Sequence, residues 1–456
     1  MHDKKKRSSF SGKLGFVLSA AGASVGLGNI WRFPYLAAKY GGGIFLLVYI
    51  ILALTFGYTM IISETALGRM TWKSPVGAFE HFGRSTPFRI GGWVNAIIPI
   101  LIVPYYSTIG GWILKYLFEY CRGNAQEVAA DGYFSSFITN GTQVEICFLI
   151  FAAINLIIIY AGVRNGIERV SSFMMPILVV LSVIIAGYSI SRPGAVEGVI
   201  YFLIPNPKNF SFMTIASAML QMFYSLSIAM GILVTFGSYM KDDVAIEEAT
   251  IHVEIFDTAI AVMAGLMIIP AVFAFSGGDP EVLQAGPSLM FITIPKVFVS
   301  MGLATPFGIM FFLLVLFAAM TSSIALLESA VSTFEDEFHI DRHVGTIIMA
   351  VVMVGIGTLS CLGYGPLSFF TIIGMQFLDF FDFLTNSVMM PISAISICVL
   401  CLKVIGIERI AAEVTKKGAP FRRKKVYEIT LRYFCIICLI IILLTSIAQV
   451  LGIVTV

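Results

Sequence analysis

Charged side chains are scarce in this sequence. Of its 456 residues only 12% are Asp, Glu, Lys or Arg, while 58% are hydrophobic, and the mean hydropathy is +0.92. Because soluble globular proteins carry about 25% charged residues, this shortage excludes a soluble globular chain and predicts a polytopic membrane protein. The formal net charge of +2 indicates no particular partner, and no basic cluster requires a nucleic acid or a special lipid.

Histidine and cysteine are also few. The histidines fall at predicted termini or cytoplasmic edges, and no nucleophile with a neighbouring base emerges, so we expect no enzyme. Two C-x-x-C pairs lie inside predicted apolar helices without nearby His or acidic residues, which favours small packing residues over zinc or redox chemistry. The residues concerned are His2, His81, His252, His339 and His343, and the pairs Cys398 with Cys401 and Cys435 with Cys438.

Long apolar runs, by contrast, are abundant. About 20 apolar residues suffice to cross a bilayer as a helix, and the sequence offers eleven such spans. The first lacks a cleavage region and is followed by further spans, so we expect a membrane span there rather than a signal peptide. The spans lie near 14–37, 43–68, 90–118, 143–162, 167–190, 213–239, 250–275, 305–333, 344–363, 370–402 and 430–454.

Basic residues are unevenly shared between the loops, and this bias predicts the orientation. The loops expected in the cytoplasm include the clusters from Lys4 to Lys13 and from Lys403 to Arg432. The opposite loops hold only scattered cations, namely Lys39, Arg122, Arg192, Lys208 and Lys296. We therefore expect a protein of the plasma membrane with a cytoplasmic N-terminus and, because the number of spans is odd, an external C-terminus.

Polar residues interrupt the first span, in the stretch GASVGLGNIWRFPY at residues 22–35. Backbone N–H and C=O groups freed at membrane depth are costly unless something satisfies them, and a cavity with a ligand does so. Close helix packing through Gly22 and Gly26 is the alternative, but it does not account for Asn29 and Arg32.

The sixth span is interrupted in the same way. It reads AMLQMFYSLSIAMGILVTFGSYM, with Gln221, Ser225, Ser227 and Gly231 at membrane depth. Two broken helices at equivalent places in two five-span halves indicate a transporter built from inverted repeats, with its site at the bilayer midplane. We expect one transporter domain over 1–456, with repeats over 14–190 and 213–402 and an eleventh helix over 430–454, although the halves share no direct sequence similarity.

A third polar patch lies in the eighth span, FAAMTSSIALLES. The hydroxyls of Thr321 and Ser322 and the carbonyl of Ala318 can point to one spot, and three such oxygens suit a hard monovalent cation. The alternative is that each hydroxyl bonds back to its own helix. The coincidence of three patches favours the cation site.

Four motifs resemble one known family. GASVGLGNIWRFPY, LQMFYSLSIAMG, FAAMTSSIA and DFFDFLTN are similar to the first, sixth, eighth and tenth spans of the neurotransmitter:sodium symporter family, in its bacterial amino-acid branch. The resemblance is collinear over nearly the whole chain. It implies two sodium sites and a substrate site at the breaks in spans 1 and 6.

The resemblance assigns ligands by position. The first sodium site would use Ser24, Asn29, Ser225 and Asp257, and the second Gly22, Val25, Ala318, Thr321 and Ser322. The substrate would contact Ser24, Gly26, Leu27, Gly28, Ile102, Tyr106, Phe223, Tyr224, Ser227, Met230, Ser322 and Leu326. The apolar end of such a pocket would suit an amino acid with a large apolar or aromatic side chain.

The resemblance also implies gates. Arg32 and Asp382 would pair above the substrate under an aromatic lid of Tyr106 and Phe223, and the loop 276–295 would cap the outer vestibule. On the inner side Arg7 would pair with Asp336, helped by Tyr239, although a simple topology charge at Arg7 is the alternative. Gly166 and Pro176 in the fifth span bracket a turn that could unwind to release sodium, unless it is a static kink.

These observations favour sodium-coupled import of a hydrophobic or aromatic amino acid by alternating access, with two sodium ions per substrate. The carboxylate of Asp257 lies where many relatives have a neutral asparagine, and it would supply the negative charge that chloride provides in other relatives, so we expect no need for chloride. The alternative is a ligand-sensing or channel-like membrane protein that kept the pocket without coupled transport. The sequence leaves the oligomeric state open.

Overall fold

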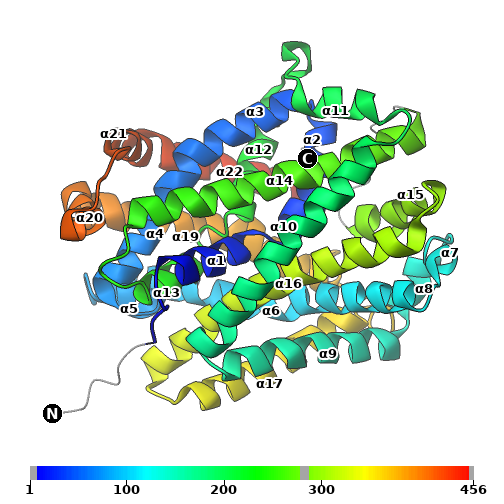
Figure 1. The fold of residues 1–456 in the computed structure, drawn as a ribbon. Coiled ribbons are helices and arrows are strands. Elements are labelled where there is room, and N and C mark those ends of the chain that lie inside the picture. The colour runs from blue at the N-terminus through cyan, green and yellow to red at the C-terminus, as the bar shows by residue number, and fades with distance from the viewer. Residues whose placement is uncertain (1–7, 278–286, 451–456) are drawn as a thin grey trace.

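The computed structural model describes residues 8–277 and 287–450, and within them the chain is helical with no β-strand (Figure 1). The first half contains α1 (Lys13–Ser24), η1 (Gly28–Arg32), α2 (Phe33–Lys39), α3 (Gly43–Leu52), η2 (Ala53–Gly57), α4 (Tyr58–Thr71), α5 (Pro75–Glu80), α6 (Thr86–Cys121), α7 (Ala125–Val128), α8 (Tyr133–Thr139), α9 (Gly141–Tyr160), η3 (Val163–Glu168), α10 (Arg169–Ile190), α11 (Ala195–Leu203) and η4 (Pro207–Asn209).

The second half begins with the two pieces of the expected sixth span. It contains α12 (Phe212–Ser225), α13 (Ile232–Ser238), α14 (Ile246–Ser276), η6 (Leu289–Thr293), α15 (Ile294–Ser300), α16 (Ala304–Phe338), α17 (Arg342–Leu362), α18 (Phe377–Asp382), η7 (Phe383–Met389), α19 (Met390–Val399), η8 (Leu400–Ile405), α20 (Ile407–Val414), η9 (Lys416–Gly418), α21 (Lys424–Ile429), η10 (Thr430–Phe434) and α22 (Cys435–Val450).

Nine helices of the described chain are long and apolar enough to cross a membrane. A tenth span results if Lys13–Ser24 and Gly28–Lys39, which meet at a bend of 54°, count as one. Neither α12 nor α13 is long enough to cross alone, because the chain unwinds between them. The fold is therefore the expected all-α membrane architecture, while the count of eleven remains a prediction that treats α12 and α13 as one span.

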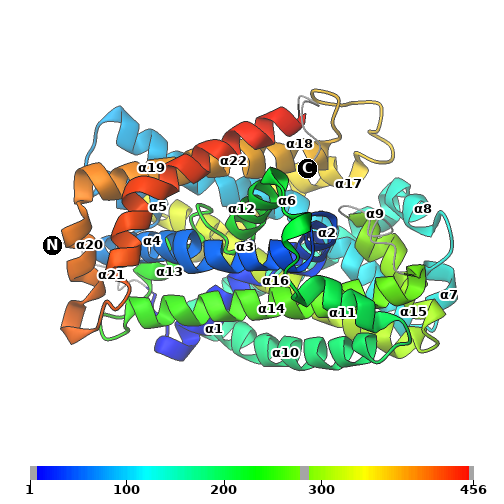
Figure 2. The same cartoon turned by 90° about the horizontal axis from the view of Figure 1, so that it is seen from above.

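The long helices run between two ends of the molecule (Figures 1 and 2). Helices α5, α20 and α21 lie at one end, and α7, α8 and α15 lie at the other. Two helices form the centre: α6 and α16 each have 78% of their most apolar stretch buried inside the protein. Short helices outside the predicted spans, such as α5 and α20, close the ends, and residues 363–376 form turns where the tenth span was expected to begin.

Both breaks lie in the protein interior. Helix α1 stops at Ser24 because Val25 is extended (φ −75°, ψ 96°). Between α12 and α13 the backbone takes left-handed conformations at Ser227 (φ 52°) and Ala229 (φ 62°), which are unusual for residues with a Cβ. Such strain persists only where surrounding contacts hold it, so the contacts of these two segments define the candidate site.

Candidate functional site

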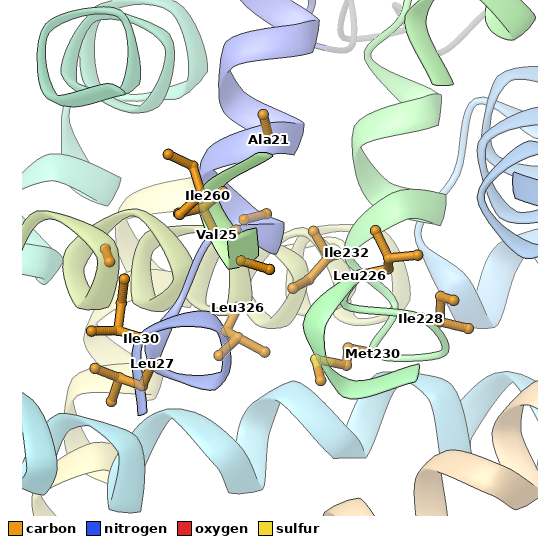
Figure 3. Packing of buried hydrophobic residues seen from close by; sticks show 14 of the residues in the cluster. Ala21, Val25, Leu27, Ile30, Leu226, Ile228, Met230, Ile232, Ile260 and Leu326 are labelled. Carbon is orange, nitrogen blue, oxygen red and sulfur yellow. The ribbon is translucent and has the colours of Figure 1, made fainter. Parts of the chain in front are cut away.

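The two breaks lie close together beside α16. Figure 3 shows Val25 and Leu27 at the break of span 1 and Ile228 and Met230 in the break of span 6, with Leu326 of α16 between them. A direct hydrogen bond joins the two broken segments, because the Ser227 hydroxyl donates to the carbonyl of Ala23 (3.0 Å). The backbone groups freed in one break are thus satisfied partly by the other.

One buried carboxylate is the centre of the first cluster. Asn29, Tyr49, Ser225 and Asp257, here called the carboxylate cluster, are at most 2% exposed. Asp257 accepts hydrogen bonds from Asn29 Nδ2 (2.8 Å), from the Ser225 hydroxyl (2.9 Å to Oδ1) and from the Tyr49 hydroxyl (2.9 Å). A fully buried charge needs such compensation. Asn29, Ser225 and Asp257 were expected together, whereas Tyr49 was not.

The side chains that donate to Asp257 also carry oxygen atoms, which are the ligands that a sodium ion needs. Asn29 turns its NH₂ group toward Asp257 and Ser225, while its Oδ1 accepts from the Gly26 amide (3.1 Å). An amide has an oxygen on its other side, so a half turn of this side chain would present Oδ1 to an ion. The donor set is therefore compatible with a sodium ion after that single rotation. The side chain of Ser24 points back along its helix to the carbonyl of Ala20 (3.1 Å).

A second cluster, called the hydroxyl site, comprises Gly22, Val25, Ala318, Thr321 and Ser322. The Ser322 hydroxyl lies 3.4 Å from the carbonyl oxygens of both Gly22 and Val25. The Thr321 hydroxyl bonds back to the carbonyl of Ala318 (3.1 Å), and Gly22 faces Thr321 so closely that an added Cβ would lie 3.1 Å from the threonine Cβ. The expected oxygens are thus assembled from α1 and α16, although the alternative back-bonding within α16 is also present.

A small cavity of about 30 Å³ lies between the two clusters. Glycine is required where other groups approach the span 1 break: a Cβ at Gly26 would lie 2.7 Å from the Ser322 hydroxyl, and one at Gly28 would lie 2.7 Å from the Tyr224 ring. The Leu27 amide donates to the Tyr106 hydroxyl (3.4 Å). The lining residues are Ala23, Ser24, Gly26, Leu27, Gly28, Asn29, Ile102, Tyr106, Tyr224, Ser225, Ser227, Met230, Ile232, Ser322 and Leu326.

One expected contact residue lies elsewhere. Phe223 does not line the cavity, because its ring packs edge-on against Phe56 of η2, with centroids 6.4 Å apart. Tyr224 precedes the break on the same helix and does line it. Ala23 and Ile232 line the cavity although the sequence motifs did not single them out.

The outer gate is arranged differently from the expected ion pair. No ion pair within 4.0 Å joins Arg32 to Asp382, two residues that both lie in the described part of the chain. Arg32 lies over the Tyr224 ring, 5.4 Å from its centroid. Asp382 accepts from Asn386 (2.6 Å) and from the Tyr105 hydroxyl (3.3 Å). The cation therefore covers the cavity through an aromatic ring, and the carboxylate is held by neutral donors.

The inner gate falls partly outside the described residues, because Arg7 is not among them. Asp336 accepts from the Ser74 amide (2.6 Å). Tyr239 donates to Glu328 (2.6 Å), a fully buried carboxylate that also pairs with Arg342. Glu328 lies on α16, the helix that also carries Thr321 and Ser322, whereas Arg342 begins α17. The sequence analysis did not single out this pair.

The bracketed turn of the fifth span is tightly packed at one end. Gly166 lies in η3, and a Cβ there would be only 2.1 Å from the carbonyl oxygen of Ile158. Pro176 lies inside α10, where it removes one helical hydrogen bond. The loop expected to cap the outer vestibule, 276–295, is described at residues 276 and 277 and again from residue 287 onward, where η6 and α15 begin.

Two polar residues missed by the sequence analysis hold the unwound segment of span 6. Glu64 of α4 accepts from the Ala229 amide (2.7 Å), and the Ser393 hydroxyl of α19 donates to the Ala229 carbonyl (3.0 Å). A buried glutamate within an apolar span is the signal that identifies the first of them. The serine carries no such signal.

The comparisons with known proteins agree with this geometry. The model of the Sodium:neurotransmitter symporter family matches residues 7–126 and 127–454. The chain belongs to this family. It is therefore a sodium-dependent transporter and a multi-pass membrane protein, and not an enzyme.

Individual relatives extend over most of the chain. A sodium-dependent transporter of Bacillus subtilis (strain 168), YhdH, is 33% identical over 416 residues, which cover 90% of this chain and 91% of that relative. The sodium- and chloride-dependent GABA transporter 2 of Mus musculus is 29% identical over 73% of this chain and 62% of its own length. The crystal structure of MhsT in complex with L-phenylalanine is 34% identical, with a TM-score of 0.86, and the match covers 96% of this chain and 100% of that one.

Proposed function

We propose that this transporter imports a hydrophobic or aromatic amino acid together with two sodium ions, by alternating access and without chloride. The N-terminus would lie in the cytoplasm and the C-terminus outside the plasma membrane. The observation that carries the proposal is the carboxylate cluster, in which side chains from the break of span 1, from the break of span 6 and from α3 converge on Asp257 of α14.

The electrostatic argument concerns the two clusters together. Two sodium ions bring two positive charges to a buried region, whereas an amino acid carboxylate and Asp257 bring two negative charges. The hydroxyl site offers only neutral oxygens, so the balance depends on Asp257. A relative whose second negative charge comes from chloride needs that anion for transport. This chain would not need chloride, because Asp257 would supply the charge.

The substrate class follows from the two ends of the cavity. The break of span 1 presents the start of a helical turn at Leu27 and Gly28, where backbone amides favour a carboxylate. The other end contains Ile102, Met230 and Leu326, which suit an apolar side chain. The likeness to the structure of MhsT with L-phenylalanine supports the same class.

The free energy that two sodium ions release on entering the cell is large enough to accumulate an amino acid. Each sodium ion gains about 2.3 kcal/mol on crossing 100 mV, and a tenfold gradient adds about 1.4 kcal/mol. Two ions would supply roughly 7 kcal/mol, which corresponds to about five decades of accumulation. A measured ratio of one sodium per substrate would remove one of the two sites.

The test is uptake of labelled amino acids into proteoliposomes. We expect accumulation above equilibrium when an inward sodium gradient is present, and none with equal sodium on both sides. A sensor or channel would bind or pass the amino acid without accumulating it. A preceding thermal-stability screen against the twenty amino acids, with and without sodium, would identify the substrate, because only a ligand that binds the folded state raises its stability.

A further inference from the structure

A groove on the outer flank of the helices lies away from the substrate cavity. It has a volume of about 430 Å³ and lies between span 2 and α14, which run side by side in Figures 1 and 2. Its wall is almost entirely apolar, with Ile50 and Leu54 on one side and Ile251, Ile255 and Ala259 on the other. Because this flank faces the bilayer, hydrocarbon is the material that fills such a groove.

One end of the groove is basic. Arg423, in the segment before α21, reaches the groove and lies 3.6 Å from Glu254. Its guanidinium also lies over the Tyr58 ring, 5.2 Å from the centroid. The charge of Arg423 is thus balanced by a carboxylate that is 2% exposed, and this pair lies in the wall of the groove.

Two neighbouring cations have no close ion pair, although Glu248, which pairs with Lys13, acts on Arg422 from beyond 4.0 Å. Arg422 is exposed, and within the described chain no carboxylate lies within 4.0 Å of its guanidinium or of the exposed Lys425 ammonium. The backbone amide of Arg422 donates to Glu247 Oε2 (2.7 Å). This hydrogen bond holds the backbone of Arg422 beside the first turn of α14. A lipid with an apolar tail and an anionic headgroup matches this arrangement, because its tail would fill the apolar slot and its headgroup would meet the two cations that have no close ion pair.

We propose that this groove binds one acyl chain of an anionic phospholipid, with its phosphate group near Arg422. The slot borders the carboxylate cluster, because Ile50 follows Tyr49 and Glu254 lies one turn before Asp257 on α14. The lipid would therefore contact the two helices that carry Tyr49 and Asp257. The basic run at 422–425 thus serves as part of a lipid site in addition to its contribution to topology.

Native mass spectrometry of the full chain tests this site. The protein is extracted from vesicles of equal phosphatidylglycerol and phosphatidylcholine, and the co-released lipids are counted. We expect preferential retention of phosphatidylglycerol by the wild type. Ala259→Phe fills the slot and abolishes retention of the bound lipid. Arg422→Gln leaves the slot open and lowers the preference for phosphatidylglycerol about fivefold, the effect of one cation near a membrane surface.

Two matched variants serve as controls. Ala153→Phe places the same ring on an exposed position of α9, and Arg164→Gln removes an exposed cation near the start of η3. Both should retain the lipid like the wild type. Gel filtration and circular dichroism establish that each variant is folded. The proposal is overturned if Ala259→Phe retains as much phosphatidylglycerol as Ala153→Phe, or if the wild type shows no preference between the two lipids.

Discussion

The carboxylate cluster and the hydroxyl site lie on either side of the same break in span 1. They differ in charge, because one contains a carboxylate and the other only neutral oxygens. The first has one formal charge, on Asp257, held by three side chains that donate to it. The second has no charged side chain, and its oxygens are backbone carbonyls of Gly22 and Val25 and hydroxyls of α16. A cation at the first site would be bound by charge, whereas a cation at the second would be bound by dipoles.

Because of this difference, we expect the two sites to respond differently to the loss of one side-chain group. Removing a buried charge from a hydrogen-bonded cluster leaves its donors unpaired as well as removing the attraction. Removing one hydroxyl from a set of neutral oxygens leaves the others in place. The charged site should therefore be the more sensitive of the two, and substitutions in each test that ranking.

The largest effect is expected for Asp257→Asn. Loss of one partner of a buried charged cluster costs about 2–5 kcal/mol, so the sodium concentration for half-maximal uptake should rise by about 30-fold or more. Sodium titration of uptake in proteoliposomes measures this. Asp242→Asn is the matched control, because Asp242 pairs with Lys416 in a partly exposed ion pair and should leave the sodium dependence unchanged. An unchanged titration for Asp257→Asn would contradict the ranking.

The same variant tests the role of chloride. Wild-type uptake should be unaffected when chloride is replaced by gluconate, because Asp257 already supplies the negative charge. In Asp257→Asn that charge is missing, so added chloride should restore part of the uptake. Collapse of wild-type uptake in gluconate would show that Asp257 does not supply the charge.

A smaller effect is expected at the hydroxyl site. The double variant Thr321→Val with Ser322→Ala removes two neutral hydroxyls, each contributing about 1 kcal/mol. Sodium affinity should therefore fall about 30-fold, the low end of the range expected for Asp257→Asn, and the sodium ratio should drop from two toward one. Parallel fluxes of labelled sodium and substrate measure the ratio. Ser323→Ala removes a neighbouring buried hydroxyl with no hydrogen-bond partner and should change neither quantity. A ratio of two in the double variant would argue against a second ion here.

The two sites also differ in how far sequence predicts them. Asn29, Ser225 and Asp257 are polar side chains in apolar spans, and each was recognisable before any coordinates. Tyr49 was not, because tyrosine is common in membrane spans and nothing in its neighbourhood marks its hydroxyl as a donor to Asp257. Only the packing of span 2 against α14 brings the two together.

The overall architecture was predictable for a similar reason. Hydropathy locates long helices well, since the bilayer sets their length, and the two breaks were visible as polar interruptions. The outer gate was not predictable in detail, because whether Arg32 meets Asp382 or the Tyr224 ring depends on side-chain conformation. The positions of short helices such as α5 and α20 likewise depend on tertiary contacts rather than on the bilayer.

The path from the hydroxyl site to the cytoplasm can be tested at Pro176. If the turn from Gly166 to Pro176 unwinds to release sodium, Pro176→Ala strengthens the helix and should slow transport several-fold while sodium-dependent substrate binding persists. Pro270→Ala, another helix-interior proline, is the control. Gly166→Ala should also slow transport, but its Cβ would meet the Ile158 carbonyl at 2.1 Å, so its folding must be verified. Normal turnover in both variants would favour a static kink.

The last substitution removes a single oxygen atom, the hydroxyl of Tyr49. Tyr49→Phe removes one hydrogen bond to the buried carboxylate of Asp257, worth about 1.5–3 kcal/mol for a charged acceptor. Sodium would neutralise that carboxylate by itself, so the thermal stability should fall in sodium-free buffer and recover as sodium is added. Tyr120→Phe is the matched control, since the buried hydroxyl of Tyr120 has no hydrogen-bond partner. If the two variants lose the same stability with and without sodium, the ion does not replace the donors around Asp257, and the carboxylate cluster is a structural feature of the fold rather than a sodium site.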